Sequence, residues 1–400
     1  MIRALRKGVL ISVVLGVLWA LVVVTCVAVA LSLATGAPLR PGLWGAALLG
    51  AGTGLGALWL RGMWPNLALG VVLAGLLQMA VPALAPIAGG GWGAAVLTGL
   101  GTGVAMAPML AGLAPGAVGR HAAEAAIIRF LTGFGYVFFT LIVVVPFYVM
   151  VMTSLKSQQA LLANPLDFRV ELSRGWDLLR SYKELFRDFH FGRYLWTSFY
   201  VAVATVLITL AFSIPGAYAV ARLRFRGRAA LSRSILLIYM VPMIVLALPI
   251  YIAFSMTGLR NSIAGIIMIY PVTTIPVALY MLQGYFRGLP AEVEEAGLMD
   301  GLSRLGVIWK ITLPLALPAL ASVSLYVFMI AWNEFLLAFM LLDDPVKFTL
   351  TRGVTMLNSS EIPRQHLMAG AVIATVPIMA LFLGLERFMT RGLTAGSVKG

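Results

Sequence analysis

Residues 8–35 read GVLISVVLGVLWALVVVTCVAVALSLAT, an apolar run without a charged side chain. A helix of about 20 apolar residues is long enough to cross the hydrocarbon core of a bilayer. The basic segment 1–7 resembles the start of a signal peptide, but such a peptide has an apolar region of only about 7–15 residues and a small-residue cleavage site. We therefore expect residues 8–34 to form a retained membrane-spanning helix.

The rest of the chain has the same character. Of its 400 residues, 61% are hydrophobic and 11% are charged, whereas soluble domains average about 25% charged residues. The apolar runs are long, and they lack the alternation of apolar and polar residues that a transmembrane β-strand shows. The sequence predicts an all-α integral membrane protein.

About ten transmembrane helices are expected. The candidate segments are 8–34, 43–60, 66–88, 92–114, 130–153, 197–221, 234–256, 262–283, 315–342 and 367–389. The chain changes character near residue 120, because no acidic residue precedes that point and glycine and alanine dominate there. Such small residues let helices pack closely in lipid. We predict an extra N-terminal four-helix membrane module, 1–120, followed by a six-helix membrane domain, 121–400.

A short motif recurs within the N-terminal module. The sequence WGAALLGAGTG at 44–54 is echoed by WGAAVLTGLGTG at 92–103. The echo suggests two related helical hairpins, 8–60 and 66–114. Chance similarity among helices rich in glycine and alanine is the alternative.

The charged residues indicate topology. The formal net charge is +14, and the basic residues lie mainly in loops between apolar runs. This pattern favours topogenic charge over nucleic-acid binding. The densest short loop, 222–233, holds five arginines, so this loop and both termini are expected in the cytoplasm. Cys26 is the only cysteine and the three histidines lack metal-ligand spacing, so no metal site is expected.

Segment 289–314, LPAEVEEAGLMDGLSRLGVIWKITLP, falls in a predicted cytoplasmic loop. Pro290 and the acids after it favour a helix start, and Gly301 can adopt the left-handed conformation that stops this helix. Ser303 can cap a second short helix, which Pro314 is expected to end. The apolar side of that helix is expected from Val307, Ile308, Trp309 and Ile311. A rigid amphipathic helix–turn–helix of this kind suits docking into a groove on a partner.

The spacing in this loop resembles the coupling signature of binding-protein-dependent ABC importer permeases. That signature is Glu-Ala-Ala, three residues, Gly, nine residues, and Ile-x-Leu-Pro; Gly297 stands where its second alanine is usual. The resemblance assigns ATPase coupling to Glu294, Glu295, Ala296, Gly297, Asp300, Gly301, Ile311, Leu313 and Pro314. An ordinary amphipathic loop is the alternative. Stretches at 146–156, 217–228, 331–335 and 391–400 also resemble the maltose-type sugar permeases, so the resemblance covers about residues 130–400.

The resemblance implies a transport subunit rather than an enzyme. The expected partners are a second permease, two cytoplasmic ATPase subunits, an extracytoplasmic solute-binding protein and membrane lipid. ATP and Mg²⁺ are expected on the ATPase, because this chain has no Gly-x-x-x-x-Gly-Lys-Ser/Thr loop. The implied substrate is a sugar or oligosaccharide of the maltose/maltodextrin-like class, and glycerol phosphate is an alternative within the same subfamily.

Glu334 is the only acidic residue predicted well inside a spanning segment. A carboxylate facing lipid is costly, so Glu334 should face protein or a water-filled path. Together with Asn333 it can offer hydrogen bonds to a sugar, whereas an interhelical hydrogen bond is the structural alternative. Weaker candidates for the translocation path are Tyr270, Thr273 and Thr274, in a proline-interrupted segment.

A second class of function remains open at this point. An ion-coupled secondary transporter or channel would need no ATPase, but it would require several intramembrane acids or histidines and matched inverted halves. The sequence offers one such acid and no evident inverted repeat. A scaffold that uses residues 1–120 for assembly is a third, weaker possibility.

Overall fold

The computed structural model describes residues 7–60, 62–80, 82–164, 167, 169, 171–237 and 240–394. The basic start at residues 1–6, Arg61 and the tail 395–400 therefore lie outside the described residues. The chain forms two compact units, Met1–Leu178 and Leu179–Gly400, and each is described by itself.

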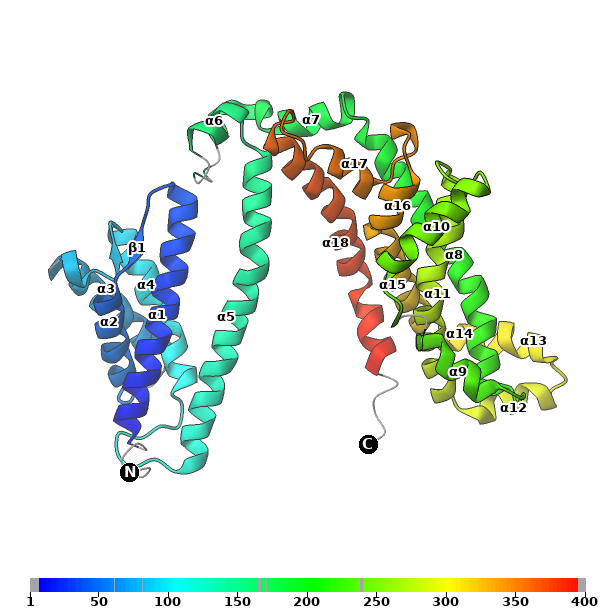
Figure 1. Ribbon diagram of the computed structural model, residues 1–400. Coiled ribbons are helices and arrows are strands. Elements are labelled where there is room, and N and C mark those ends of the chain that lie inside the picture. The colour runs from blue at the N-terminus through cyan, green and yellow to red at the C-terminus, as the bar shows by residue number, and fades with distance from the viewer. Residues whose placement is uncertain are drawn as a thin grey trace. The chain divides into compact units, whose positions relative to one another are not determined.

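The first unit is a set of helices joined by short connections (Figure 1). Its elements are α1 (Gly8–Thr35), β1 (Arg40–Pro41), α2 (Leu43–Gly56), α3 (Met63–Ala80), η1 (Pro82–Leu84), β2 (Ile87–Ala88), α4 (Trp92–Met109), α5 (Arg120–Ser154) and α6 (Gln158–Ala163). β1 and β2 form a two-residue antiparallel ladder in which Arg40 pairs with Ala88. The expected all-helical unit thus contains one very short sheet, which ties the α1–α2 connection to the α3–α4 connection.

Glycines bring α1 and α2 into backbone contact. A Cβ atom placed on Gly16 would collide with the carbonyl oxygen of Gly50, and one placed on Gly50 would collide with that of Gly16. One turn further along α2, a Cβ on Gly54 would collide with the carbonyl oxygen of Ser12. The two helices therefore pack at a distance that only glycine permits.

The same arrangement recurs between α3 and α4. A Cβ atom placed on Gly70 would collide with the carbonyl oxygen of Gly99, and one placed on Gly99 would collide with that of Gly70. A Cβ on Gly103 would likewise collide with the carbonyl oxygen of Asn66. The Oγ1 of Thr102 donates to the carbonyl oxygen of Thr98 at 2.8 Å, as that of Thr53 does to Leu49 at 2.8 Å in α2. The motif echo at 44–54 and 92–103 therefore corresponds to two structurally related hairpins, which favours the repeat over chance similarity.

The second unit is a helical bundle with short helices at both ends of its long ones. Its elements begin within η2 (Leu172–Leu179) and continue as α7 (Arg180–Arg187), α8 (Phe191–Arg222), α9 (Arg228–Leu237), α10 (Met243–Met256), α11 (Ile263–Gly288), α12 (Ala291–Met299), α13 (Arg304–Val307), the π-helix η4 (Ile308–Thr312), α14 (Leu313–Leu315), α15 (Leu317–Asn333), α16 (Leu336–Leu341), η5 (Pro345–Lys347), α17 (Leu350–Met356) and α18 (Arg364–Thr394).

Two apolar clusters hold this bundle together. One gathers Phe191 of α8, Tyr270 of α11 and Trp332 of α15 with residues of α16 to α18. The other joins α8, α11 and α15 through Ala217, Phe286 and Val327, toward the end that carries α12. The long helices α8, α11 and α15 thus run between the two ends of the unit and share its core.

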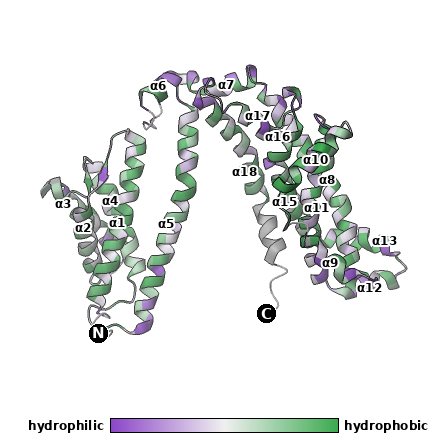
Figure 2. Cartoon of the chain, viewed as in Figure 1, coloured by the Kyte–Doolittle hydropathy of each residue, from purple (hydrophilic) through white to green (hydrophobic). Residues whose placement is uncertain are grey.

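Six helices among the described residues are long and apolar enough to cross a membrane: α1, α3, α5, α8, α11 and the Arg364–Leu385 part of α18. The bent pair Arg304–Leu315 and Leu317–Asn333 would add a seventh, while α2 and α10 are shorter apolar helices. Hydrophobic residues run along most of the helical lengths (Figure 2). Two of the ten predicted spans are divided into two helices: 234–256 into α9 and α10, and 315–342 into α15 and α16. A third, 66–88, is wrong at its end, because α3 stops at Ala80 and η1 and β2 follow. Hydropathy did not reveal these breaks, because the residues on both sides are apolar.

The division into compact units falls after Leu178 rather than near residue 120. α5, predicted as the first helix of the six-helix domain, contacts the N-terminal helices: Phe130 meets Trp19 edge to face at 6.4 Å, and Arg129 donates from Nη1 to the carbonyl oxygen of Ala111 at 2.7 Å. Whether residues 1–120 can be separated from the rest stays a prediction.

Candidate coupling loop and translocation residues

The loop between α11 and α15 begins with a helix whose two ends are defined by sequence. Pro290 is the N-cap of α12, and Glu292 and Glu294 lie in its first turn. At the other end Gly301 has φ +87°. Its amide N–H donates to the carbonyl oxygen of Leu298 at 3.1 Å, and that of Leu302 donates to Gly297 at 3.1 Å. This is the Schellman pattern, which requires a residue that tolerates the left-handed conformation.

A second helical segment returns toward the membrane helices. The Oγ of Ser303 accepts the amide N–H of Gly306 at 3.2 Å, which confirms the predicted cap. The sequence predicted that the helical run ends at Pro314. It ends one residue later, because α13, η4 and the three-residue α14 follow one another to Leu315, and the chain bends by 77° before α15. Pro314 is tolerated because it lies in the first turn of a new helix, where no intrahelical N–H bond is lost. Pro318 has the same position in α15.

The two adjacent glutamates of the motif have opposite surroundings. Glu295 is exposed, whereas Glu294 is buried. The Glu294 carboxylate accepts hydrogen bonds from Tyr218 Oη at 3.2 Å and from Thr312 Oγ1 at 3.1 Å. Its Oε1 lies 3.5 Å from Nε of Arg222. The motif spacing did not predict these three partners, although Tyr218 and Arg222 lie in the stretch 217–228 that already carried a family resemblance.

The small residue at position 297 is required by close packing. Gly297 is buried, and an added Cβ would clash with Cδ1 of Ile311. Because Cδ1 is the end of a flexible side chain, an alanine would require only that Ile311 move. Of the other predicted coupling positions, Ala296, Asp300, Gly301 and Pro314 are exposed, and Ile311 and Leu313 are half-buried.

The exposed apolar side chains of the loop coincide with the predicted ones only at Trp309. Val307 is buried and Ile308 is half-buried, so these two belong to the loop's own packing. Met299 is 88% exposed, Leu305 69% and Trp309 71%. These three residues leave the loop with an apolar surface that its own unit does not cover.

Glu334 lies at a helix break rather than inside a continuous helix. α15 ends at Asn333 and α16 begins at Leu336. The Glu334 carboxylate accepts the amide N–H groups of Leu337 at 2.7 Å and Ala338 at 3.1 Å. A carboxylate at a helix N-terminus satisfies unpaired donors and the positive end of the helix dipole. Both oxygens therefore serve the start of α16, which accounts for the acid without a substrate.

The remaining path candidates do not form one cluster. Tyr270 is buried, with its hydroxyl facing the Glu334 carboxylate. Thr274 shares a 2.6 Å hydrogen bond with Thr209 of α8, and Thr273 donates to the carbonyl oxygen of Tyr270 at 2.8 Å. Asn333 is exposed, and its amide donates to the carbonyl oxygen of Met329 at 2.9 Å. The structure thus brings Tyr270 and Glu334 together and uses Thr274 to join two helices.

One polar pair, His366 with Glu184, was not predicted from the sequence. His366 lies at the start of α18 and is buried, and its Nε2–H donates to Oε2 of Glu184 in α7 at 2.6 Å. Arg180 binds the other oxygen of Glu184 at 2.6 Å. Burial opposes ionisation of Glu184, but the hydrogen bonds from Arg180 and His366 outweigh it and hold the pKa of this carboxyl below its usual value. The residues are far apart in sequence, so spacing gave no signal.

Comparison with known proteins identifies the family to which this chain belongs. The family of binding-protein-dependent transport system inner membrane components matches residues 213–394. The inner membrane ABC transporter permease protein YcjP of Escherichia coli (strain K12) is 37% identical over 270 residues, which are 66% of this chain and 95% of that protein. The chain belongs to the binding-protein-dependent ABC transporter permeases. It is therefore a multi-pass, all-α membrane subunit of a transporter.

Two further likenesses extend over the same share of the permease. The trehalose/maltose transport system permease protein MalG of Thermococcus litoralis is 33% identical over 281 residues, 69% of this chain and 99% of that protein. A bacterial ABC transporter involved in the import of the acidic polysaccharide alginate has a chain with TM-score 0.57 and 23% identity, covering 68% of this permease and 98% of that chain. This structural likeness supports the fold. About a third of this permease is additional to each of these proteins.

Proposed function

We propose that this permease imports a sugar or oligosaccharide of the maltose/maltodextrin-like class. An extracytoplasmic binding protein would deliver the substrate, a second permease would complete the pathway, and two ATPase subunits would bind ATP and Mg²⁺ on the cytoplasmic side. The likeness to a trehalose/maltose permease over nearly the whole of that protein carries the choice of substrate class.

The loop 290–314 supports the ATP-driven mechanism. Its Schellman turn at Gly301 fixes the angle between two short helices, and Met299, Leu305 and Trp309 stay uncovered. A rigid helix with exposed apolar anchors suits a groove on a partner. In the proposed orientation this loop and both termini face the cytoplasm, so closure of the ATPase would act on the loop.

Uptake by vesicles tests the substrate and the energy source together. The permease would be reconstituted with a partner permease, an ATPase and a binding protein, and supplied with radiolabelled maltose, trehalose or glycerol 3-phosphate. Accumulation of maltose or trehalose that requires internal ATP is expected. If glycerol 3-phosphate alone is taken up in an ATP-dependent manner, it takes the place of the sugar as the proposed substrate. Uptake driven by an ion gradient without ATP would overturn the proposal.

A further inference from the structure

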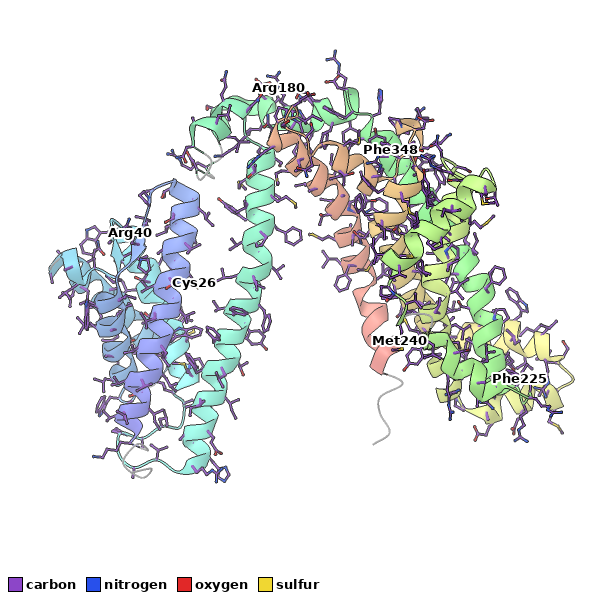
Figure 3. All side chains as sticks on the ribbon, in the orientation of Figure 1. Cys26, Arg40, Arg180, Phe225, Met240 and Phe348 are labelled. Atoms are coloured by element: carbon purple, nitrogen blue, oxygen red, sulfur yellow. The ribbon has the colours of Figure 1, made fainter. Side chains whose placement is uncertain are left out.

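A coupling loop has to move helices to which it is not directly joined along the chain. α12 follows α11, and α14 leads into α15, but α8 ends far away in sequence, at Arg222. The contacts of the loop with α8 therefore decide whether α8 follows its movement. These contacts gather on one buried carboxylate, that of Glu294, which meets Tyr218 and Arg222 in the last turns of α8. Figure 3 labels Phe225, which follows the end of α8.

Three elements converge on this carboxylate. Glu294 belongs to α12, Tyr218 and Arg222 lie one turn apart on α8, and Thr312 ends the π-helix η4. The side chains of Arg222 and Glu294 are 15% and 11% exposed. Charges this far removed from water interact strongly, and loss of one partner leaves the other buried and unpaired.

Arg222 also reaches the hinge at which the loop begins. Its Nη2 donates to the carbonyl oxygen of Leu289 at 2.6 Å, next to Pro290 and the start of α12. Arg228 fixes the same end of α8, with Nε donating to Val220 at 2.7 Å and Nη2 to Ala221 at 2.9 Å. The end of α8 is thus bound both to the start of the loop and to its first helix.

The ion pair is not fully closed. Nε of Arg222 is buried and has no hydrogen-bond partner among the described residues, and Oε1 of Glu294 lies 3.5 Å away. A charge-assisted hydrogen bond closes at about 2.7–2.9 Å. A displacement of α12 toward α8 by less than about 1 Å would bring Oε1 of Glu294 within hydrogen-bond distance of this buried donor.

We propose that the Glu294–Arg222 pair transmits movement of the coupling loop to α8, while the adjacent Glu295 faces the ATPase. Glu294 is then a positioning residue inside the permease rather than part of the docking surface. The hydrogen bond between Thr209 and Thr274 joins α8 to the middle of α11, so that these two helices would move together. The inference rests on the proposed docking of this loop with an ATPase.

The experiment uses the reconstituted complex and separates docking from transmission. Glu294→Gln keeps side-chain volume but removes the charge, and Glu292→Gln changes an exposed acid of the same helix as a control. Tyr218→Phe removes one hydrogen bond and is the milder variant if Glu294→Gln is inserted poorly. Docking is measured as ATPase co-purified per permease, and transmission as maltose imported per ATP hydrolysed.

We expect Glu294→Gln to retain ATPase within about twofold of wild type and to lose roughly tenfold in maltose imported per ATP, because a buried arginine is left unpaired. Tyr218→Phe should show a smaller loss in the same direction. Glu292→Gln should match wild type. Equal maltose import per ATP in wild type and Glu294→Gln would overturn the proposal. A second variant, Glu295→Gln, serves as the docking comparison, and the proposal would also be overturned if Glu294→Gln lost as much bound ATPase as Glu295→Gln.

A distance measurement tests the mechanical role without a substrate. Spin labels at Arg224→Cys and Glu292→Cys report on the end of α8 and on α12, in a Cys26→Ala background; both positions are exposed, and neither is among the residues proposed to dock. If the pair transmits movement, this distance stays narrow when ATP binds in wild type and broadens in Glu294→Gln. A broad distance distribution in both proteins would contradict the pair's role. Absence of ATPase binding by the wild-type permease would instead contradict the proposed function.

Discussion

The imidazole of His366 and the carboxylate of Glu184 lie 2.6 Å apart and join α18 to the short helix α7. α7 is outside the long spanning helices, and Ser181 and Leu185 are its buried residues. Arg180 faces the same carboxylate from within α7, and Phe189 lies against the imidazole with ring centroids 5.8 Å apart. This pair therefore adds a charged contact to the apolar packing of Leu185 that holds α7 on the bundle.

Acid should weaken this attachment. Because the pKa of Glu184 is lowered in the folded protein, its contribution to stability is present above the usual value of 4.5 and is lost as pH falls through the lowered pKa. At pH 7, Glu184→Gln should lower the melting temperature of the purified permease by a few degrees, as expected for about 1 kcal/mol. The difference from wild type should shrink below pH 4.5. Asp188→Asn, at an exposed carboxylate, is the control; a difference that persists unchanged at pH 3–4 would contradict the assignment.

Glycine packing in the N-terminal hairpins predicts opposite outcomes for one substitution at two positions. Gly50→Ala places a Cβ against the backbone of α1 and should destabilise the chain by about 1–3 kcal/mol. Gly93→Ala, at the start of α4, has nothing within 4 Å of the added Cβ and should be neutral or slightly stabilising. Thermal unfolding of both variants in the same detergent is the measurement. Equal stability of the two variants would show that α1 and α2 do not pack as described.

Deletion of residues 1–119 should leave ATPase binding intact while lowering stability in detergent. The loop 290–314 lies in the other compact unit and makes its described contacts there. The deletion removes Trp19 and Ala111, however, and so takes away the partners of Phe130 and Arg129 of α5. Co-purification of ATPase with the truncated chain, given a basic start, tests the first expectation, and thermal unfolding tests the second. Stable insertion without ATPase binding would show that the N-terminal helices are integral to assembly.

Sequence predicted most of the architecture because its signals are local. Apolar runs identified the long helices, Gly301 and Ser303 identified the turn and the cap of the coupling loop, and the glycine motif identified the hairpins. The break at Glu334 was missed, because an acid in an apolar run looks the same whether it caps a helix or faces a pathway. The partners of Glu294 were missed because Arg222 and Thr312 meet it only through tertiary packing.

The proposed orientation predicts which positions react from outside an intact cell. In a Cys26→Ala background, variants with a single cysteine in place of Ala4, Ser173 or Val398 would be treated with a membrane-impermeant thiol reagent. Ser173 is exposed between α6 and α7 and should be labelled, whereas Ala4 and Val398 should react only after the cells are opened. Permeabilised cells provide the control for reactivity. If the cysteine at position 4 or 398 is labelled in intact cells and the one at position 173 is not, the proposed orientation is the reverse of the real one.

The turn at Gly301 predicts a loss of coupling without a loss of the membrane fold. A β-branched residue is strained at φ +87°, so Gly301→Val should change the angle between α12 and α13. We expect roughly 1–2 kcal/mol of local strain and a clear fall in binding-protein-stimulated ATP hydrolysis and maltose uptake, at wild-type levels of inserted permease.

Gly288→Ala is the matched control, because Gly288 ends α11 beside the same loop and an added Cβ meets nothing within 4 Å. Glu295→Lys should act like Gly301→Val, but by reversing a charge on the exposed side of α12, so it should also reduce ATPase co-purification. Wild-type hydrolysis and uptake in both Gly301→Val and Glu295→Lys would mean that the loop 290–314 does not couple the permease to an ATPase. Loss in Gly301→Val alone would confine the coupling role to the angle between the two short helices.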